Sequence, residues 1–96
     1  MRLRDEIMKL RPQILATAAA SGATNVRVFG SVARGADDEN SDVDFLVALD
    51  KGRTLLDLAR LEIHLEALLG RKVDVVTEAS LQEPIRATAV REAISV

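Results

Sequence analysis

The sequence predicts an α/β protein of the α+β type, in which helices flank a small three-stranded mixed sheet. Three short segments rich in valine or phenylalanine have the composition of strands, and the stretches between them have helical spacing. The chain has 96 residues, of which 48% are apolar, enough for one hydrophobic core and too few for two. We therefore expect residues 1–96 to form a single domain with the element order α-β-(short α)-β-α-β-α.

Helical spacing first appears in residues 3–21. Four apolar residues recur there at the i, i+4, i+7, i+11 spacing of one helix face: Leu3, Ile7, Leu10 and Ile14. Pro12 cannot donate the hydrogen bond that a helix interior requires, so it either kinks this helix or begins a second one. Gly22 is the expected end, because glycine readily adopts the left-handed conformation that follows a helix.

Three segments alternate apolar residues with others, as half-buried strands do; they are residues 26–29, 42–49 and 72–77. In the second segment, Val43, Phe45 and Val47 share one face, whereas Asp42 and Asp44 open the other. This strand therefore contributes to the core from one face and brings two carboxylates to the opposite one.

Residues 53–69 have the clearest helical pattern, and Gly70 is the expected end. The broad apolar side of this helix consists of Leu55, Leu58, Leu61, Leu65, Leu68 and Leu69. Leu56 and Ile63 fall outside it and form a smaller apolar patch. His64 is also outside it and is expected at the surface.

The last helix is predicted from a capping sequence. Ser80 and Glu83 have the spacing of a capping box, in which Ser80 is the N-cap. This box predicts a helix that continues to about Ser95, with Pro84 in its first turn.

Composition excludes several kinds of functional site. The chain has no Cys and one His, which rules out a thiolate metal site and a His-rich zinc site. Its net charge of −2 argues against direct nucleic-acid binding, which normally requires a basic excess. Phe29 and Phe45 are its only aromatic residues, too few for a platform that stacks single strands.

The sequence contains no targeting or membrane signal. No apolar run approaches the roughly 18 residues of a membrane span, and the charged N-terminal residues Arg2, Arg4, Asp5 and Glu6 are unlike a signal peptide. We expect a cytoplasmic protein that contacts no membrane.

Asp42 and Asp44 are the first candidate functional residues. Two positions apart on a strand, they point to the same face, roughly 7 Å apart at the backbone. Such carboxylates repel each other unless a cation lies between them, and Mg²⁺ prefers oxygen ligands of this kind. Asp74, alone among valines, joins them if the second and third strands are neighbours. Each of these residues also has an ordinary structural explanation. Asp42 and Asp44 can simply line a solvated strand end, and Asp74 can pair with an arginine or face water.

Residues 30–35 are long enough only for a turn of helix after the first strand. Gly30 lets the backbone approach a ligand closely, and the following N–H groups and the Ser31 hydroxyl can bind an anion. The same residues can also form an ordinary turn. They are not a P-loop, because Ala36 and Asp37 stand where that motif has Lys and Ser or Thr.

Arg34 has two possible roles. It can steady a triphosphate or a transition state, or it can form a salt bridge to the acidic residues 37–39, which are expected to be a solvated loop. Ser41 is expected to shape the turn into the second strand. An EF-hand calcium loop is excluded, because Val43 and Leu49 occupy the positions of its invariant glycine and bidentate glutamate.

The spacing of three short features resembles a known signature. Gly30-Ser31 is followed after ten residues by Asp42-Val43-Asp44, and Asp74 comes one strand later. This pattern resembles the signature of the nucleotidyltransferase superfamily related to DNA polymerase beta. Residues 29–35 and 41–44 look like those of minimal nucleotidyltransferases (MNT), which often are the antitoxin halves of HEPN/MNT toxin–antitoxin pairs. The resemblance covers nearly the whole chain and implies the polymerase beta-like fold. It departs from the family at Val32, where many relatives carry Arg.

This resemblance implies a Mg²⁺-dependent enzyme that transfers a nucleoside monophosphate, AMP from ATP, to a hydroxyl and releases pyrophosphate. The residues that would be catalytic and would hold two Mg²⁺ ions are Asp42, Asp44 and Asp74. Among these, Asp74 would orient or deprotonate the hydroxyl. The residues that would bind the nucleotide are Gly30, Ser31 and Arg34. The sequence shows no base pocket and places neither phenylalanine against a base.

The implied acceptor is a tyrosine of a HEPN toxin, a small helical ribonuclease with which the chain would form a hetero-oligomer. Two alternatives remain open. One is a nucleotidyltransferase for a small-molecule acceptor such as an aminoglycoside, and the other is an antitoxin that blocks its toxin by stoichiometric contact without essential catalysis. A chain of 96 residues is too short to enclose an acceptor as well, which favours a protein partner.

Overall fold

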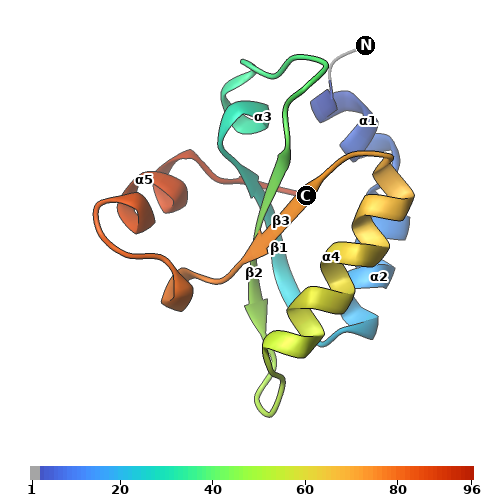
Figure 1. Cartoon of the computed structure of the whole chain (residues 1–96), viewed down its shortest axis with the longest axis vertical. Coiled ribbons are helices and arrows are strands. Elements are labelled where there is room, and N and C mark those ends of the chain that lie inside the picture. Colours follow the sequence, from blue (N-terminus) through green and yellow to red (C-terminus); the bar gives the residue numbers. More distant parts are fainter. Residues whose placement is uncertain (1–2) are drawn as a thin grey trace.

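The computed structural model describes residues 3–96, which form a four-stranded mixed sheet with helices on both faces (Figure 1). The spatial order of the strands is β3-β2-β1-β4. β1 pairs antiparallel with both β2 and β4, and β2 pairs parallel with β3. The elements are α1 (Leu3–Lys9), α2 (Arg11–Ala20), β1 (Ala23–Phe29), α3 (Ser31–Arg34), β2 (Val43–Leu49), α4 (Leu55–Leu69), β3 (Val73–Val76), the 3₁₀ turn η1 (Glu78–Ser80), α5 (Ile85–Glu92) and β4 (Ile94–Ser95). The α+β class and the mixed sheet are confirmed, but the sheet has a fourth strand that was not predicted.

The predicted cap of the last helix is wrong. The Ser80 hydroxyl turns back to Thr77, accepting from its N–H at 3.2 Å and donating to its carbonyl at 2.8 Å. The first of these bonds belongs to the capping box of the short turn η1, in which Thr77 is the N-cap, and α5 begins only at Ile85. Ser80 is therefore engaged before the helix starts and cannot be its N-cap.

The end of the chain is a strand and not a continuation of α5. Ile94 lies opposite Val28 in β1, and the Val96 N–H donates to the Val26 carbonyl at 2.9 Å. Without β4, this side of β1 would be a sheet edge with unpaired backbone groups. Pairing with that distant edge outweighs the local helical tendency of the last residues.

Pro12 separates two helices, as one of the sequence alternatives proposed. It lies in the first turn of α2, where a missing N–H costs little. Gly22 has a φ of 73°, and its N–H donates to the Ala19 carbonyl at 3.0 Å, so α2 ends where expected.

β1 starts at Ala23, earlier than predicted, because a β-bulge at Asn25 lets its pairing with β2 continue.

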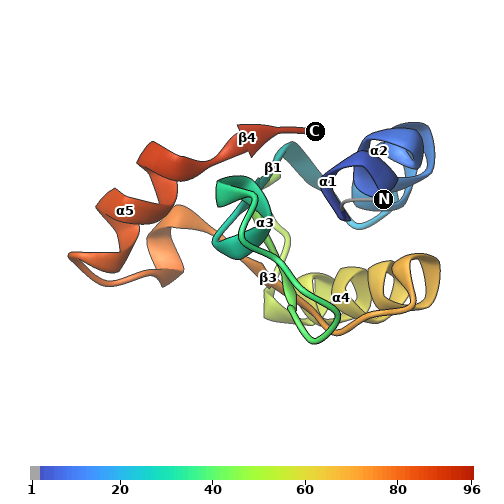
Figure 2. The ribbon, with the colours of Figure 1, turned by 90° about the horizontal axis from the view of Figure 1, so that it is seen from above.

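The main core lies between the sheet and helices α1, α2 and α4, which cover one face, while α5 lies on the other (Figure 2). Val43, Phe45 and Val47 are at most 1% exposed and face this core, as predicted. Leu55 was predicted to be part of the apolar side of α4 but is 76% exposed. It is the first residue of the helix, and the core contact begins one turn later at Leu58. Within residues 3–96, no helix is long and apolar enough to cross a membrane.

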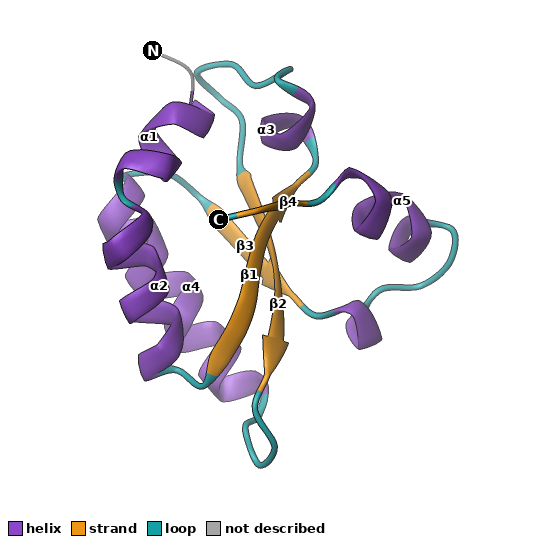
Figure 3. Cartoon of the chain, turned by 180° about the vertical axis from the view of Figure 1, so that it is seen from behind, coloured by secondary structure: helices purple, strands orange, loops and turns teal. Residues whose placement is uncertain are grey.

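On the second side of the sheet lies α5, as Figure 3 shows from behind, and it contacts β1, while η1 contacts β2. Leu46 in β2 and Ala89 in α5 are buried outside the main core cluster. By strand alternation, Asp42 and Asp44 lie on the same side of β2 as Leu46. The acidic residues therefore belong to the α5 side of the sheet.

The outer edge of β3 is closed by two carboxylates of α4. Glu66 accepts a hydrogen bond from the Val73 N–H at 3.1 Å, and Glu62 accepts one from the Val75 N–H at 3.2 Å. An edge strand otherwise presents unpaired N–H groups. The two bonds flank Asp74 on both sides and hold the strand that carries it.

Candidate active site

Phe29, Asp44 and Asp74 form a row across the α5 side of the sheet, which we call the carboxylate row after its two aspartates. Asp44 lies opposite Phe29 in β1 and opposite Asp74 in β3. Residues directly opposite in neighbouring strands point to the same face, and the strands are about 4.8 Å apart. Asp74 is therefore next to Asp44, the arrangement expected if the second and third strands were neighbours.

Asp44 is in an environment that disfavours its negative charge. Burial raises its pKa above the ordinary value of 3.8, and the nearby carboxylates of Asp74 and Asp42 raise it further. The Arg34 cation acts in the opposite direction but does not cancel the increase. Asp42 itself lies immediately before β2 and is half-buried. The three predicted carboxylates thus interact electrostatically at one place.

Gly30 joins the end of β1 to α3 and lies against Asp44. Its φ of 72° and ψ of −148° belong to a region that only glycine occupies readily. A Cβ on Gly30 would be 2.5 Å from Asp44 Oδ2, closer than real side chains approach. Ser31 follows as the first residue of α3, where helix N–H groups have no partner within the helix. The predicted anion-binding turn therefore directly borders the carboxylate row.

Arg34 does not pair with the acidic residues 37–39, so that alternative is wrong. Its Nη1 lies 3.0 Å from Glu92 Oε2 in α5, a residue that the sequence analysis did not single out. No local pattern could have revealed this pair, because 58 positions separate the two residues. The guanidinium is about half exposed, and its positive charge acts to lower the pKa of Asp44.

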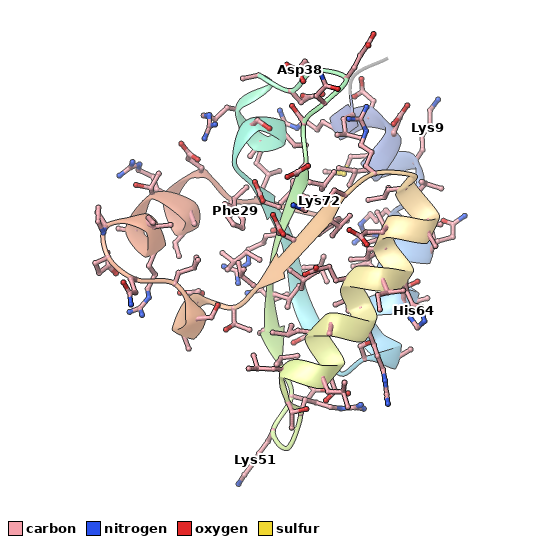
Figure 4. All side chains as sticks on the ribbon, viewed as in Figure 1. Lys9, Phe29, Asp38, Lys51, His64 and Lys72 are labelled. Atoms are coloured by element: carbon pink, nitrogen blue, oxygen red, sulfur yellow. The ribbon has the colours of Figure 1, made fainter. Side chains whose placement is uncertain are left out.

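The loop between α3 and β2 is held by side chains that hydrogen-bond to its backbone. Ser41 Oγ accepts from the Asp38 N–H at 2.8 Å, so Ser41 shapes the turn as predicted. Arg71, which the sequence analysis missed, donates at 3.2 Å to the carbonyls of Asp38, Glu39 and Ser41. In Figure 4, Asp38 lies far from Phe29, and His64 lies on the outer side of α4. Asp38 and Glu39 of the acidic loop are exposed as expected, whereas Asp37 is partly buried, and His64 is a surface residue as expected.

A cleft of about 260 Å³ adjoins the turn at Gly30. Phe29, Gly30 and Arg34 line one side, and α5 lines the other, including Ile85 and Glu92. Phe29 therefore faces a space between the sheet and α5, which its position in the sequence did not reveal.

Comparison with known proteins identifies this arrangement. Residues 8–96 match the family described as nucleotidyltransferase domain, and these residues include the carboxylate row and the glycine turn. The chain belongs to the nucleotidyltransferase family. Its predicted membership in this family is confirmed.

Several relatives of this nucleotidyltransferase are similar over most of their length. It is 45% identical over 75 residues to protein adenylyltransferase MntA of Thermococcus cleftensis, covering 78% of this chain and 76% of the relative. It is 37% identical over 90 residues to a Methanocaldococcus jannaschii protein provisionally named a protein adenylyltransferase, covering 94% and 97%.

Solved structures confirm the fold. One, provisionally described as a minimal nucleotidyltransferase, superposes with a TM-score of 0.87 at 50% identity and covers 100% of this chain and 97% of that one. Another, described as a toxin–antitoxin with AMP-PNP, superposes with a TM-score of 0.75 at 21% identity and covers 88% and 69%. The second shows similarity of fold alone.

The carboxylates of this nucleotidyltransferase fit a Mg²⁺ site that substrate completes. Within residues 3–96, no three His, Cys, Asp or Glu side chains are arranged as a full ligand set. Magnesium sites of phosphoryl-transfer enzymes usually have one or two carboxylates, with substrate phosphates and water supplying the other ligands. Asp44 and its neighbours offer hard oxygen ligands whose mutual repulsion a divalent cation would relieve. The donor set therefore suits Mg²⁺ bound together with a nucleotide.

Proposed function

We propose that this nucleotidyltransferase transfers AMP from ATP to a hydroxyl of a partner protein, specifically a tyrosine of a HEPN ribonuclease toxin, and thereby acts as its antitoxin. The observation that carries the proposal is the row of Asp44 and Asp74 beside Gly30. The proximity of these carboxylates to the glycine turn supports a metal-assisted transfer with the phosphates bound at that turn. The names of the relatives, protein adenylyltransferase and toxin–antitoxin, support the acceptor class.

In the proposed reaction, Asp42, Asp44 and Asp74 would hold two Mg²⁺ ions. When bound, these ions neutralise the phosphate oxygens and lower the pKa of the attacking hydroxyl. Gly30 and Ser31 bind the β- and γ-phosphates through backbone N–H groups and the Ser31 hydroxyl, and Arg34 steadies the triphosphate.

Asp74 orients the acceptor hydroxyl and accepts its proton. The acceptor oxygen forms a bond to the α-phosphorus, and the bond from that phosphorus to the bridging oxygen of the β-phosphate breaks. Pyrophosphate leaves with the electron pair of that bond, and the acceptor carries AMP. Most of the rate increase comes from position and electrostatics, which three aspartates and a turn can supply.

Two features of the chain favour a separate protein as acceptor. These 96 residues contain no Tyr and therefore offer no tyrosine acceptor of their own. The described residues also include five large apolar side chains that are exposed: Leu55, Leu56, Ile63, Ile85 and Val90. Such residues can contribute to an interface with a partner.

The test follows the phosphate that is transferred. The chain is incubated with Mg²⁺ and with ATP labelled at either the α- or the γ-phosphate. The mixture also contains the neighbour, which is the protein encoded beside the chain and co-expressed with it, as the candidate toxin. We expect label on a tyrosine of the neighbour from α-labelled ATP only, and none with Asp44→Asn. Asp50→Asn, an exposed aspartate just after the same strand, is the matched control and should remain active. Label from the γ-phosphate only would show a kinase and refute the proposal.

A second measurement separates enzymatic from stoichiometric inhibition. The toxin ribonuclease is titrated with the chain, with and without ATP. An enzyme silences an excess of toxin only when ATP is present, whereas a blocking protein needs equal amounts and no ATP. Inhibition at a one-to-one ratio by Asp44→Asn without ATP would contradict the catalytic role.

A further inference from the structure

The cleft between the sheet and α5 borders the carboxylate row but contains none of its aspartates. We propose that it binds the base of the nucleoside triphosphate, stacked on Phe29 and contacted from the α5 side by Ile85. This inference rests on the proposed function, because it assigns the nucleotide's base to a place beside that site.

The cleft is connected to the rest of the nucleotide site by shared residues. Gly30 and Arg34 line it, and both belong to the turn proposed to bind the phosphates. Phe29 lies opposite Asp44 in the paired strands β1 and β2. A nucleotide with its phosphates beside Gly30 and Asp44 can therefore reach the cleft with its other end.

The volume of the cleft suits a base and not a whole nucleotide. At about 260 Å³ it is slightly smaller than the roughly 300–1,000 Å³ of pockets that enclose drug-sized ligands. A triphosphate would have to remain outside, where the glycine turn and the carboxylates are.

The chemistry of the walls also favours a base. Phe29, Ile85 and Ala89 present apolar surface, and an aromatic ring can stack on the flat face of any base. Glu92 lies at the cleft and is tied to Arg34 at 3.0 Å, so the two walls are joined by an ion pair. Because the two opposite charges are paired, the walls have no excess charge at this place and suit an uncharged base.

The acceptor side chain is a less suitable occupant because of the direction of attack. In-line transfer requires the acceptor to approach opposite the leaving pyrophosphate. The cleft shares Gly30 and Arg34 with the pyrophosphate-binding turn and lies at the Phe29 end of the row. Asp74, proposed to orient the acceptor, lies at the other end.

The test compares two ligands that differ in having a nucleoside. Binding of AMP-PNP and of inorganic tripolyphosphate to the full chain is measured by calorimetry in Mg²⁺. Ile85→Ala has a matched control in Ile63→Ala, since both side chains project from helices and are 60% and 63% exposed. We expect Ile85→Ala to weaken AMP-PNP binding about fivefold to tenfold and to leave tripolyphosphate binding unchanged. Ile63→Ala should change neither.

Phe29→Leu provides an independent variant that keeps apolar volume and removes the ring. It should weaken AMP-PNP binding by about tenfold or more without changing tripolyphosphate binding. If both variants bind AMP-PNP as the unmodified chain does, the base is elsewhere and the inference is wrong, although the proposed function stands. Equal losses for both ligands would also overturn it, because the defect would then lie in phosphate binding. If the unmodified chain binds neither ligand, the proposed function and the inference both fail.

Discussion

Gly30 and Asp44 are in such close contact that the space for a side chain on Gly30 is already occupied by the Asp44 carboxylate. The Cβ of an alanine at position 30 would be 2.5 Å from Asp44 Oδ2. The glycine of the turn and the aspartate of the strand are thus parts of one site, although 14 positions separate them in the sequence.

The first prediction concerns Gly30→Ala. This change should displace the Asp44 carboxylate and abolish nucleotidyl transfer, because backbone strain and a steric clash act together. Gly70→Ala is the control: Gly70 also has a positive φ, 66°, but nothing lies within 4 Å of its would-be Cβ. The control should lose about 1–2 kcal/mol of unfolding free energy and keep its activity, whereas Gly30→Ala should lose more. Urea unfolding and transfer assays measure both, and an active Gly30→Ala variant would contradict the contact.

The second prediction concerns the charge of Asp44. Because its pKa is raised in the folded state, the stability associated with this group is complete below the unfolded value of 3.8 and is lost as pH rises through the folded pKa. Asp44→Asn removes this ionisation. In EDTA at pH 7, the variant should therefore melt at a higher temperature than the unmodified chain, and the difference should shrink at pH 4.

Magnesium provides the complementary measurement for Asp44. Adding Mg²⁺ with AMP-PNP should raise the melting temperature of the unmodified chain, because ligands that bind only the folded state stabilise it. The melting temperature of Asp44→Asn should rise much less, whereas that of the control Asp50→Asn should rise as much as that of the unmodified chain. An equal gain for Asp44→Asn would remove Asp44 from the ligand set.

The third prediction separates catalysis from stability at Arg34. Arg34 is about half exposed in its ion pair with Glu92, so Arg34→Ala should cost less than about 1 kcal/mol of unfolding free energy. The transfer rate should nevertheless fall at least tenfold, since Arg34 is proposed to steady the triphosphate. Arg53→Ala breaks a comparably exposed pair with Asp57 in α4 and should leave the rate unchanged. If the two variants had the same transfer rate, Arg34 would be only a structural residue.

The fourth prediction concerns the edge of β3. Glu66→Ala removes the acceptor of the Val73 N–H and should cost about 1–2 kcal/mol, whereas Glu66→Gln keeps an acceptor and should cost less. Hydrogen exchange should show faster exchange of the Val73 amide in the alanine variant. Glu39→Ala, in the exposed loop, is the control. Unchanged exchange at Val73 would indicate that the carboxylate does not close this edge.

The components of the site could be predicted from the sequence because each has a local signature. Asp42 and Asp44 share a strand face by alternation, and Gly30-Ser31 follows a β-rich segment. The pairing of Asp44 with Asp74 was predicted only conditionally, because strand order is not encoded by local alternation. The parallel register of β2 and β3 satisfied the condition.

Two differences between prediction and structure have a common cause. Ile94 has a local pattern typical of a helix, but it pairs with Val28 in β1. One of the two roles considered for Arg34 paired it with the nearby acidic residues 37–39, whereas its partner Glu92 lies on α5. A local pattern describes which partners are close along the chain, and the contacts of Ile94 and Arg34 were decided by elements that meet only after folding. Ser80 is a different case, because its partner Thr77 is only three positions away and a local turn competes with the helix cap.

The sequence alone narrowed the chemistry to be expected of this small chain. With no Cys, one His and two aromatic residues, metal-on-carboxylate chemistry is the remaining prediction, and the spacing of the glycine turn and the aspartates predicted the family that residues 8–96 match. The tertiary structure decided the rest: which aspartates are neighbours, how β3 is held, and that α5 and Phe29 enclose a cleft next to the glycine turn. Residue types and short spacings fix the available functional groups, whereas distances between groups on different strands exist only once the sheet and its helices have packed.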